Sequence, residues 1–228
     1  MSLFSKDFKE GVKDIAPILV GIIPFGMIAG IAAINAGLSK ISALAMSVFL
    51  FAGAAQLAVI QLIADNSAVV VIIGTALVIN LRFVMYSASL APYFKDIPPR
   101  MKFTLSYLLT DQPYALSISR FAKDNKVNPI KYYLGNGIVL WVVWQLSTLV
   151  GIFVGYGIPK EWGLDFAIPL TFMVLLFKAM EDSATVTAAV IGGLAALVAR
   201  PLPYNLGLII AALIGVAAGL AVEIRKNK

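Results

Sequence analysis

The sequence contains no cysteine and no histidine, and only 13% of its 228 residues are charged. Without cysteine there are no disulfides and no thiolate ligands, and without histidine the imidazole chemistry of zinc sites and catalytic triads is excluded. So few charges cannot coat a soluble globule of this length, and 60% of the residues are hydrophobic with a mean hydropathy of +0.90. The composition predicts a membrane protein throughout, without a metal site and without a cofactor.

The net charge of +6 does not indicate nucleic acid binding, because the Lys and Arg residues fall at the ends of apolar segments. No phosphate-binding loop of the ATPase type is present, so direct driving by ATP is not expected. The opening MSLFSKDFKEGVKDI lacks the apolar core and cleavage site of a signal peptide. The first apolar segment is therefore expected to stay in the mature protein.

Seven apolar runs are long enough to cross about 30 Å of hydrocarbon. They predict an all-α, multi-pass fold in which residues 1–228 form a single integral membrane domain. The runs cover residues 15–34, 41–63, 68–90, 132–156, 164–180, 184–199 and 206–224.

An eighth segment, residues 101–121, has the length of a span but carries Thr-Asp-Gln-Pro at its centre. It either crosses the bilayer or re-enters as a broken helix held inside the protein. If it does not cross, the loop charges favour an outside N-terminus; if it crosses, they favour an inside N-terminus. Seven spans are preferred, and both alternatives place the C-terminus in the cytoplasm.

Similarity between two parts of the sequence suggests an internal repeat. Residues 64–68 (ADNSA) resemble residues 180–184 (MEDSA), and at nearly the same offset Gly74 falls on Gly192 and Arg82 on Arg200. Two three-span units, 15–91 and 132–200, joined by a non-crossing segment would have opposite orientations, as in many secondary transporters. The alternative is chance similarity between apolar sequences.

Arg82 lies inside the apolar run 68–90 with no carboxylate in that run. A charged side chain near the middle of a membrane costs about 2.5–3.5 kcal/mol on insertion scales, so it must face protein or a water-filled cavity. One hypothesis is that Arg82 binds an anionic ligand, and the alternative is a buried ion pair with Asp111. Both hold if a substrate competes for the pair.

Helical periodicity gives this run two polar stripes, which indicates that it is not simply exposed to lipid. One stripe holds Thr75, Arg82, Tyr86 and Ser89, and the nearly opposite one holds Asn80 and Ser87.

Two other spans contain features that interrupt helices or pack them closely. Pro24-Phe25-Gly26 is expected to interrupt the first span, and Gly53 and Gln56 place a small residue and an amide inside the second. Backbone groups freed at such breaks need neighbours, water or a ligand. The alternative is a plain kink or close packing, and Gly26-x-x-x-Gly30 is one of three GxxxG pairs typical of close helix contacts, with 151/155 and 215/219.

Several short motifs, in this order and spacing, resemble the AzlC family. They are Pro24-Phe25-Gly26, Phe51-Ala52-Gly53-Ala54-Ala55-Gln56, Asn80-Leu81-Arg82, Tyr86-Ser87-Ala88-Ser89-Leu90-Ala91-Pro92 and Leu108-Leu109-Thr110-Asp111. The resemblance implies the large subunit of a bacterial exporter of valine, leucine, isoleucine and sometimes methionine in the cytoplasmic membrane. It also implies a separately encoded small membrane partner of the AzlD type. Gln112 stands where an acidic residue is expected, so a two-carboxylate role there is in doubt.

A zwitterionic amino acid needs a cation or helix N-terminus for its carboxylate, an acceptor for its ammonium and an apolar pocket. The resulting substrate-binding candidates are Arg82, Asn80, Asp111, Gln56, Pro24, Phe25, Gly26, Gly53 and Tyr86, with Phe51, Phe83 and Met85 as further pocket candidates. Asp111 is also the candidate for carrying a coupling proton. No enzymatic activity is expected. The alternative function is a non-catalytic membrane subunit or a channel for another small solute.

Overall fold

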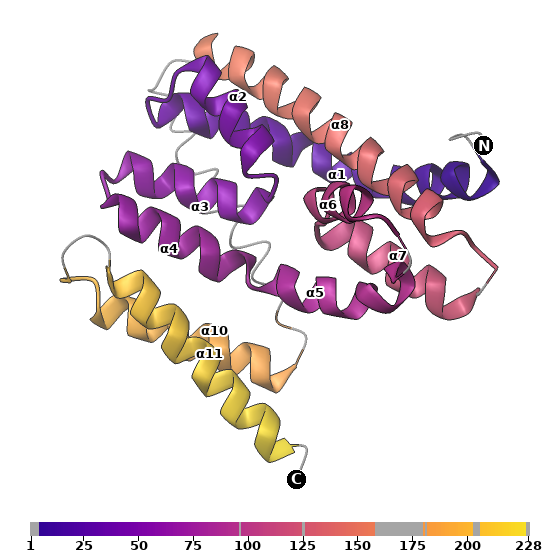
Figure 1. The fold of residues 1–228 in the computed structure, drawn as a ribbon. Coiled ribbons are helices and arrows are strands. Elements are labelled where there is room, and N and C mark those ends of the chain that lie inside the picture. Colours follow the sequence, from indigo (N-terminus) through magenta and orange to yellow (C-terminus); the bar gives the residue numbers. More distant parts are fainter. Residues whose placement is uncertain are drawn as a thin grey trace. The chain divides into compact units, whose positions relative to one another are not determined.

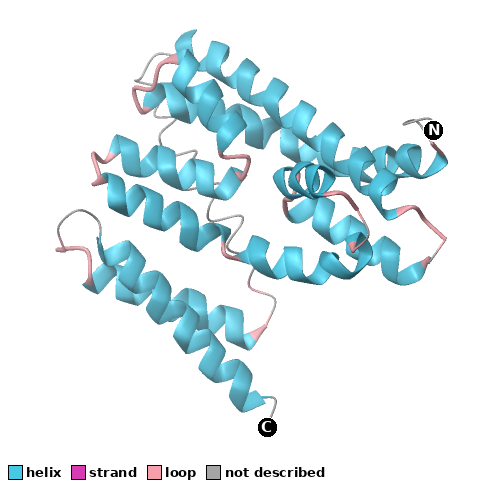
Figure 2. Cartoon of the chain, viewed as in Figure 1, coloured by secondary structure: helices cyan, strands magenta, loops and turns pink. Residues whose placement is uncertain are grey.

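The computed structural model describes residues 5–95, 97–124, 126–157, 180, 182–202 and 206–226. Regular structure in these ranges is entirely helical, which confirms the predicted all-α class (Figures 1 and 2). The elements are α1 (Lys6–Asn35), α2 (Lys40–Phe49), α3 (Gly53–Ala64), α4 (Val69–Asn80), α5 (Arg82–Leu90), the 3-10 helix η1 (Ala91–Phe94), α6 (Pro99–Tyr107), α7 (Asp111–Lys123), α8 (Pro129–Gly157), α10 (Ser183–Val198) and α11 (Leu206–Lys226).

Four stretches of the described chain are long and apolar enough to cross a membrane, which supports a membrane protein. They are Lys6–Asn35, Val69–Phe94, Pro129–Gly155 and Leu206–Lys226, and α2, α3 and α10 are shorter apolar helices. The predicted count of seven or eight spans is not confirmed. The run expected at 164–180 lies outside the described residues except for Met180.

The chain divides into two compact units. The first contains Met1–Gln56 and Asn80–Pro159, and the second contains Leu57–Ile79 and Lys160–Lys228. The organisation as a single membrane domain stays a prediction.

The first unit is built on α1 and α8, which lie side by side along their length (Figure 1). Glycines let the two backbones touch, because a Cβ at Gly30 would collide with the carbonyl oxygen of Thr148 and lie 2.7 Å from the amide nitrogen of Ile152. At the other end of the pair, Gly11 meets the carbonyl of Tyr132 in the same way. The predicted role of the glycine pairs at 26/30 and 151/155 in close helix packing is confirmed.

The predicted interruption at Pro24-Phe25-Gly26 is wrong. α1 continues from Lys6 to Asn35 with Pro17 and Pro24 inside it. A proline removes only one backbone donor, and helices in membranes tolerate this loss when neighbouring groups satisfy the backbone. Gly26 serves packing instead, because a Cβ there would lie 2.8 Å from the Cβ of Ser147 on α8.

The inverted repeat is not confirmed. Early residues of α1 contact early residues of α8 and late residues contact late ones, as Gly11 with Tyr132 and Ile31 with Gly155 show. α1 and α8 therefore run parallel (Figure 1). Because these helices open the two predicted units, an inversion would require them to run antiparallel.

α6 and α7 form a hairpin against α8. Three hydrogen bonds trace its path in chain order: Tyr133 to the carbonyl of Leu105 (3.1 Å), Trp141 to the hydroxyl of Tyr107 (2.8 Å), and Asn136 to the hydroxyl of Ser117 (3.2 Å). The chain thus advances along α8 to Trp141 and then returns. Its tip, residues 108–110, contains the predicted break before Asp111. Of the two alternatives for residues 101–121, this geometry favours the re-entrant one.

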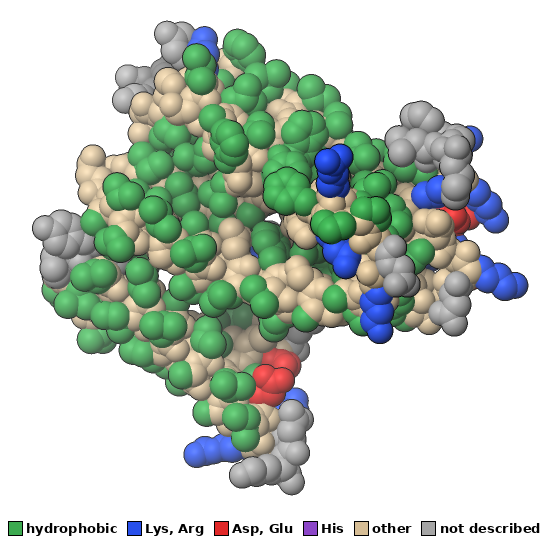
Figure 3. Space-filling model, in the orientation of Figure 1, with side chains coloured by type: hydrophobic (Ala, Val, Ile, Leu, Met, Phe, Trp, Pro, Cys, Tyr) green, Lys and Arg blue, Asp and Glu red, His purple; other side chains and the backbone are tan. Residues whose placement is uncertain are grey.

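The N-terminal end of α1 lies beside the end of α7 and the start of α8. Glu10 pairs with Arg120 at 2.6 Å, and Tyr132 donates to Asp14 at 2.7 Å. Lys and Arg side chains gather at this end of the unit (Figure 3). Both orientations considered from the sequence separate part of this basic set across the membrane, whereas the structure brings the N-terminus and the flanks of the α6–α7 hairpin together. The positive-inside tendency then predicts that this end faces the cytoplasm.

The second unit pairs α10 with α11, again through glycine. A Cβ at Gly215 would lie 3.1 Å from the Cα of Gly192, so the predicted packing role of the 215/219 pair is confirmed. Asp182 begins α10 with a capping box, in which its carboxylate accepts from the backbone of Thr185 while the Thr185 hydroxyl accepts from the Asp182 backbone.

Candidate functional site

Arg82 and Asp111 form an ion pair between α5 and α7, with 3.1 Å between Nη1 and Oδ1. The Tyr86 hydroxyl donates to the same carboxylate oxygen at 3.0 Å. The pair is only partly buried, because the side chains of Arg82 and Asp111 are 30% and 39% exposed in the isolated chain. The ion pair predicted as one alternative for Arg82 is confirmed. Three of the predicted site residues therefore meet at one place.

A second contact joins α5 to α7 one turn further on. Tyr114 donates to the hydroxyl of Ser89 at 3.3 Å, and its ring stacks on that of Tyr86 with 4.1 Å between centroids and an angle of 9°. The predicted stripe of Arg82, Tyr86 and Ser89 therefore faces α7, while Thr75 of the same stripe belongs to the other unit. Tyr114 was not predicted as a site residue, although its place three residues after Asp111 puts it on the next helical turn.

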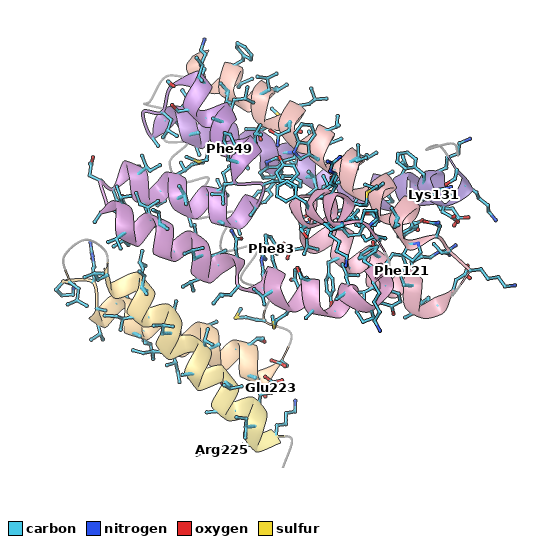
Figure 4. The ribbon with its side chains drawn as sticks, in the orientation of Figure 1. Phe49, Phe83, Phe121, Lys131, Glu223 and Arg225 are labelled. Atoms are coloured by element: carbon cyan, nitrogen blue, oxygen red, sulfur yellow. The ribbon has the colours of Figure 1, made fainter. Side chains whose placement is uncertain are left out.

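Local structure stabilises both charges. Asp111 occupies the first turn of α7, where the helix dipole favours a negative group. The guanidinium carbon of Arg82 lies 5.3 Å from the centroid of the Phe83 ring, within cation–π range. Figure 4 labels Phe83. The Nε of Arg82 is buried and has no hydrogen-bond partner within the described ranges. Arg82 thus keeps one donor for a further ligand.

The break between α2 and α3, at residues 50–52, is held by side chains from distant helices. Gln145 of α8 donates to the carbonyl of Ser47 at 3.2 Å, and Tyr107 of α6 donates to the carbonyl of Val48 at 2.8 Å. The rings of Phe51 and Tyr107 are 6.2 Å apart. The α2–α3 break and the tip of the α6–α7 hairpin are therefore neighbours. Opposed broken helices of this kind form substrate sites in secondary transporters.

Three further predicted residues gather where α3 begins. A Cβ at Gly53 would lie 2.6 Å from Phe25 and 2.9 Å from Trp144, whose rings make an edge-to-face contact at 5.4 Å. Gln56, one turn into α3, is fully buried, and neither of its amide atoms has a hydrogen-bond partner in the part of the chain that the structure describes. Trp144 was missed, because α8 reads as generic apolar sequence.

The other predicted residues lie elsewhere. Pro24 is exposed on α1, and Gly26 packs against α8. Asn80 ends α4 one residue before the turn at Leu81, and its buried Oδ1 is unpaired among the described residues. Met85, expected to line a pocket, is 66% exposed, so it does not line one here.

A cavity of about 170 Å³ opens between α5, η1, α6 and α8, and its apolar lining includes Leu90, Phe94 and Leu105. Its polar lining includes Ser87, from the stripe opposite Arg82, together with Ser106 and Lys102. It contains none of the predicted site residues. α5 therefore has polar contacts on two faces, as its sequence pattern indicated. As for metals, the described residues contain no group of three acidic side chains placed to hold an ion.

Comparisons with known proteins place these motifs in a family. Residues 17–158 match the AzlC protein family. The inner membrane protein YgaZ of Escherichia coli is 28% identical over 223 residues, which cover 94% of this chain and 89% of that protein. An uncharacterized membrane protein of Archaeoglobus fulgidus is 30% identical over 213 residues, 91% of this chain and 92% of its own length. An uncharacterized membrane protein of Helicobacter pylori strain 26695 is 28% identical over 179 residues, 78% of each chain.

No solved structure matches the chain. The family match covers both breaks, the ion pair and all of α8, so the residues that form the candidate site lie within the matched region. This chain is a membrane protein that belongs to the AzlC family.

Proposed function

We propose that this protein is a secondary transporter that exports branched-chain amino acids, valine, leucine and isoleucine, with methionine as a further substrate, across the bacterial cytoplasmic membrane. The observation that carries the proposal is the Arg82–Asp111 pair, a partly exposed pair of opposite charges beside the break in the α6–α7 hairpin. Charges inside membrane segments mark substrate and ion paths, and broken helices mark the binding sites of transporters. The AzlC membership supports the substrate class through the resemblance described above.

The chemistry of the site suits a zwitterion with an apolar side chain. Asp111 offers a carboxylate to the substrate ammonium, and the aromatic rings of Phe83, Tyr86 and Tyr114 offer apolar surface beside it. A substrate that competes for Asp111 loosens its bond to Arg82, which couples binding to a rearrangement of α5 against α7. Protonation of Asp111 has the same effect, and this makes Asp111 the proposed coupling residue.

A small membrane subunit of the AzlD type is part of the proposal. Large apolar side chains such as Val20, Ile41 and Phe49 are 75%, 82% and 88% exposed in the isolated chain. Lipid and a membrane partner both accept such surfaces.

The test is transport in proteoliposomes that contain the full chain and its small partner, with labelled leucine or valine and with or without a pH gradient. Arg82→Lys should reduce substrate flux about tenfold or more while the protein stays folded, because lysine replaces a planar fork of donors by a point charge. Arg100→Lys, at an exposed position at the start of α6, is the matched control and should keep full flux.

Absence of substrate-dependent flux under every imposed gradient would overturn the proposal. The alternative function, a non-catalytic subunit that scaffolds its partner, gives a different result. It predicts that Arg82→Ala and Asp111→Ala weaken assembly but leave the flux per assembled complex unchanged.

A further inference from the structure

The start of α3 lies inside the first unit, directly after a break in the helices. α3 has 12 residues and begins at Gly53, directly after the break at 50–52. The first amides of a helix have no acceptor within that helix and carry its positive dipole end. Ala52, which precedes the helix, has only a methyl side chain and cannot cap these amides.

Two buried side chains with unpaired donors belong to the same place. Gln56 is fully buried and Trp144 is 3% exposed, and within the described chain neither the Gln56 amide atoms nor the indole Nε1 of Trp144 has a hydrogen-bond partner. Most buried polar atoms in proteins are paired, so unpaired ones mark positions where water or a ligand completes the site.

Glycine at position 53 lets the ring of Trp144 approach the start of α3. The ring of Trp144 lies so close to the backbone there that a Cβ would come within 2.9 Å of Cη2. The indole therefore lies against the first residue of α3, and Gln56 follows three residues later on the same helix. The ring of Phe25 contacts both this start and Trp144, and the ring of Phe51, two residues before Gly53, lies 6.2 Å from that of Tyr107.

Backbone amides, an indole N–H and a side-chain amide form a set dominated by donors. Such a set suits a carboxylate, since it matches a negative charge without placing a second full charge in the membrane. Arg82, the other candidate for this task, already has its charge matched by Asp111 at 3.1 Å.

We infer that the carboxylate of the exported amino acid binds at the N-terminus of α3, where Trp144 and Gln56 donate to it, while its ammonium is left to Asp111. The inference rests on the proposed function and adds Trp144 to its binding residues. It predicts that recognition depends on the carboxylate, so leucinol, which has the leucine side chain and ammonium but no carboxylate, competes poorly.

The experiment uses the full chain with its partner in proteoliposomes and measures the leucine concentration for half-maximal exchange. Trp144→Phe removes the N–H but keeps an aromatic ring, and Gln56→Leu removes the amide at similar volume. Each should weaken leucine binding about tenfold or more, because each loses a hydrogen bond to a charged group. In the wild type, leucinol should compete far more weakly than leucine, and in Trp144→Phe this difference should shrink.

Matched controls lie on the same two helices. Trp141→Phe also removes an indole N–H from α8, but that N–H donates to Tyr107. Gln61→Leu removes an amide from α3 that donates to Asp65 on an exposed surface. Both controls should keep the wild-type affinity for leucine. A second readout, the rise in unfolding temperature that leucine causes in detergent, should be lost in Trp144→Phe and Gln56→Leu and kept in the controls.

The outcomes separate the two proposals. Leucine transport by the wild type with unchanged affinity in both Trp144→Phe and Gln56→Leu overturns the carboxylate site and leaves the transport function standing. An equal loss of affinity for leucine and leucinol also overturns it, because that pattern indicates lost packing. A wild type without leucine transport or leucine-dependent stabilisation overturns the proposed function itself.

Discussion

The hydroxyl of Tyr107, the last residue of α6, lies 2.8 Å from the carbonyl oxygen of Val48 near the end of α2. This single bond joins two helix breaks that are 59 residues apart in sequence. It also satisfies a carbonyl that the end of α2 leaves without a partner in its own helix. The two breaks are thereby fixed against each other inside the first unit.

The two stacked tyrosines are predicted to differ in their effect on the ion pair. Tyr86→Phe removes a hydrogen bond to a carboxylate, worth about 1.5–3 kcal/mol, whereas Tyr114→Phe removes one to the neutral hydroxyl of Ser89, worth about 0.5–1.5 kcal/mol. Both keep the ring stack. Tyr86→Phe should therefore lower leucine flux clearly more than Tyr114→Phe, measured as initial rates in proteoliposomes. Equal effects would show that only the rings matter.

Asp111→Asn is predicted to separate substrate movement from its driving force. The amide keeps the size of the side chain and can still accept from Tyr86, but it cannot take up or release a proton near neutral pH. Exchange of labelled for unlabelled leucine should persist at a reduced rate, while accumulation driven by a pH gradient should vanish. Gradient-driven accumulation that survives in Asp111→Asn would exclude Asp111 as the coupling residue.

The contact between α1 and α8 gives a prediction about stability. Gly30→Ala forces a Cβ against the backbone of α8 and should lower the free energy of unfolding by about 1–3 kcal/mol or more. Gly21→Ala, on the same helix, meets nothing within 4 Å and should be neutral or stabilising by about 0.5–1 kcal/mol. Loss of the helical circular dichroism signal on heating in detergent measures both. Similar behaviour of the two variants would contradict the close contact.

The absence of cysteine makes the orientation directly testable. Lys9→Cys on α1 and Lys126→Cys before α8 each introduce the only thiol of the protein, at exposed positions of the same basic end. A charged, impermeant maleimide added to intact cells should label neither, and both should react once the membrane is opened. Ser42→Cys, near the opposite end of α1, should react from outside. Labelling of only one of the two lysine positions in intact cells would contradict the shared end.

Asp182 gives a prediction about pH. Hydrogen bonds from the backbone and side chain of Thr185 hold the pKa of this carboxyl below its ordinary value of 3.8. A folded-state pKa below the unfolded one stabilises the protein above the unfolded value, and the stabilisation is lost as the pH falls through the lower folded value. Wild type should therefore unfold at a higher temperature than Asp182→Asn at pH 7, and this difference should shrink below about pH 4. A difference that is constant down to pH 3 would contradict the carboxylate cap.

Much of the ion-pair site could be predicted from the sequence. Arg82 and Asp111 stand out because a charge within apolar sequence must find a partner, and helical periodicity puts Arg82, Tyr86 and Ser89 on one face. The break before Asp111 was visible as Thr110-Asp111-Gln112-Pro113 inside a run of span length. These features depend on local chemistry, so local sequence is enough to find them.

The α2–α3 break and the start of α3 could not be predicted in the same way. The side chains that hold the break, Gln145 and Tyr107, come from α8 and α6. The sequence near residues 50–52 contains no signal that points to these two residues. The prediction of a helix break at Pro24 was wrong for the opposite reason. Proline is a strong local signal for a break, but the packing of α1 on α8 keeps the helix continuous there. The direction of α8 relative to α1 depends on how many segments cross the membrane, which hydropathy alone did not settle.

The glycine contact between α1 and α8 has a mechanical consequence. Two helices whose backbones touch at both ends cannot slide past each other or rotate on each other without large clashes, so they move as one rigid body. Any conformational change that lets a solute pass must therefore occur in the segments that pack against α1 and α8. These are the α6–α7 hairpin and the end of α2, which a few hydrogen bonds attach to α8.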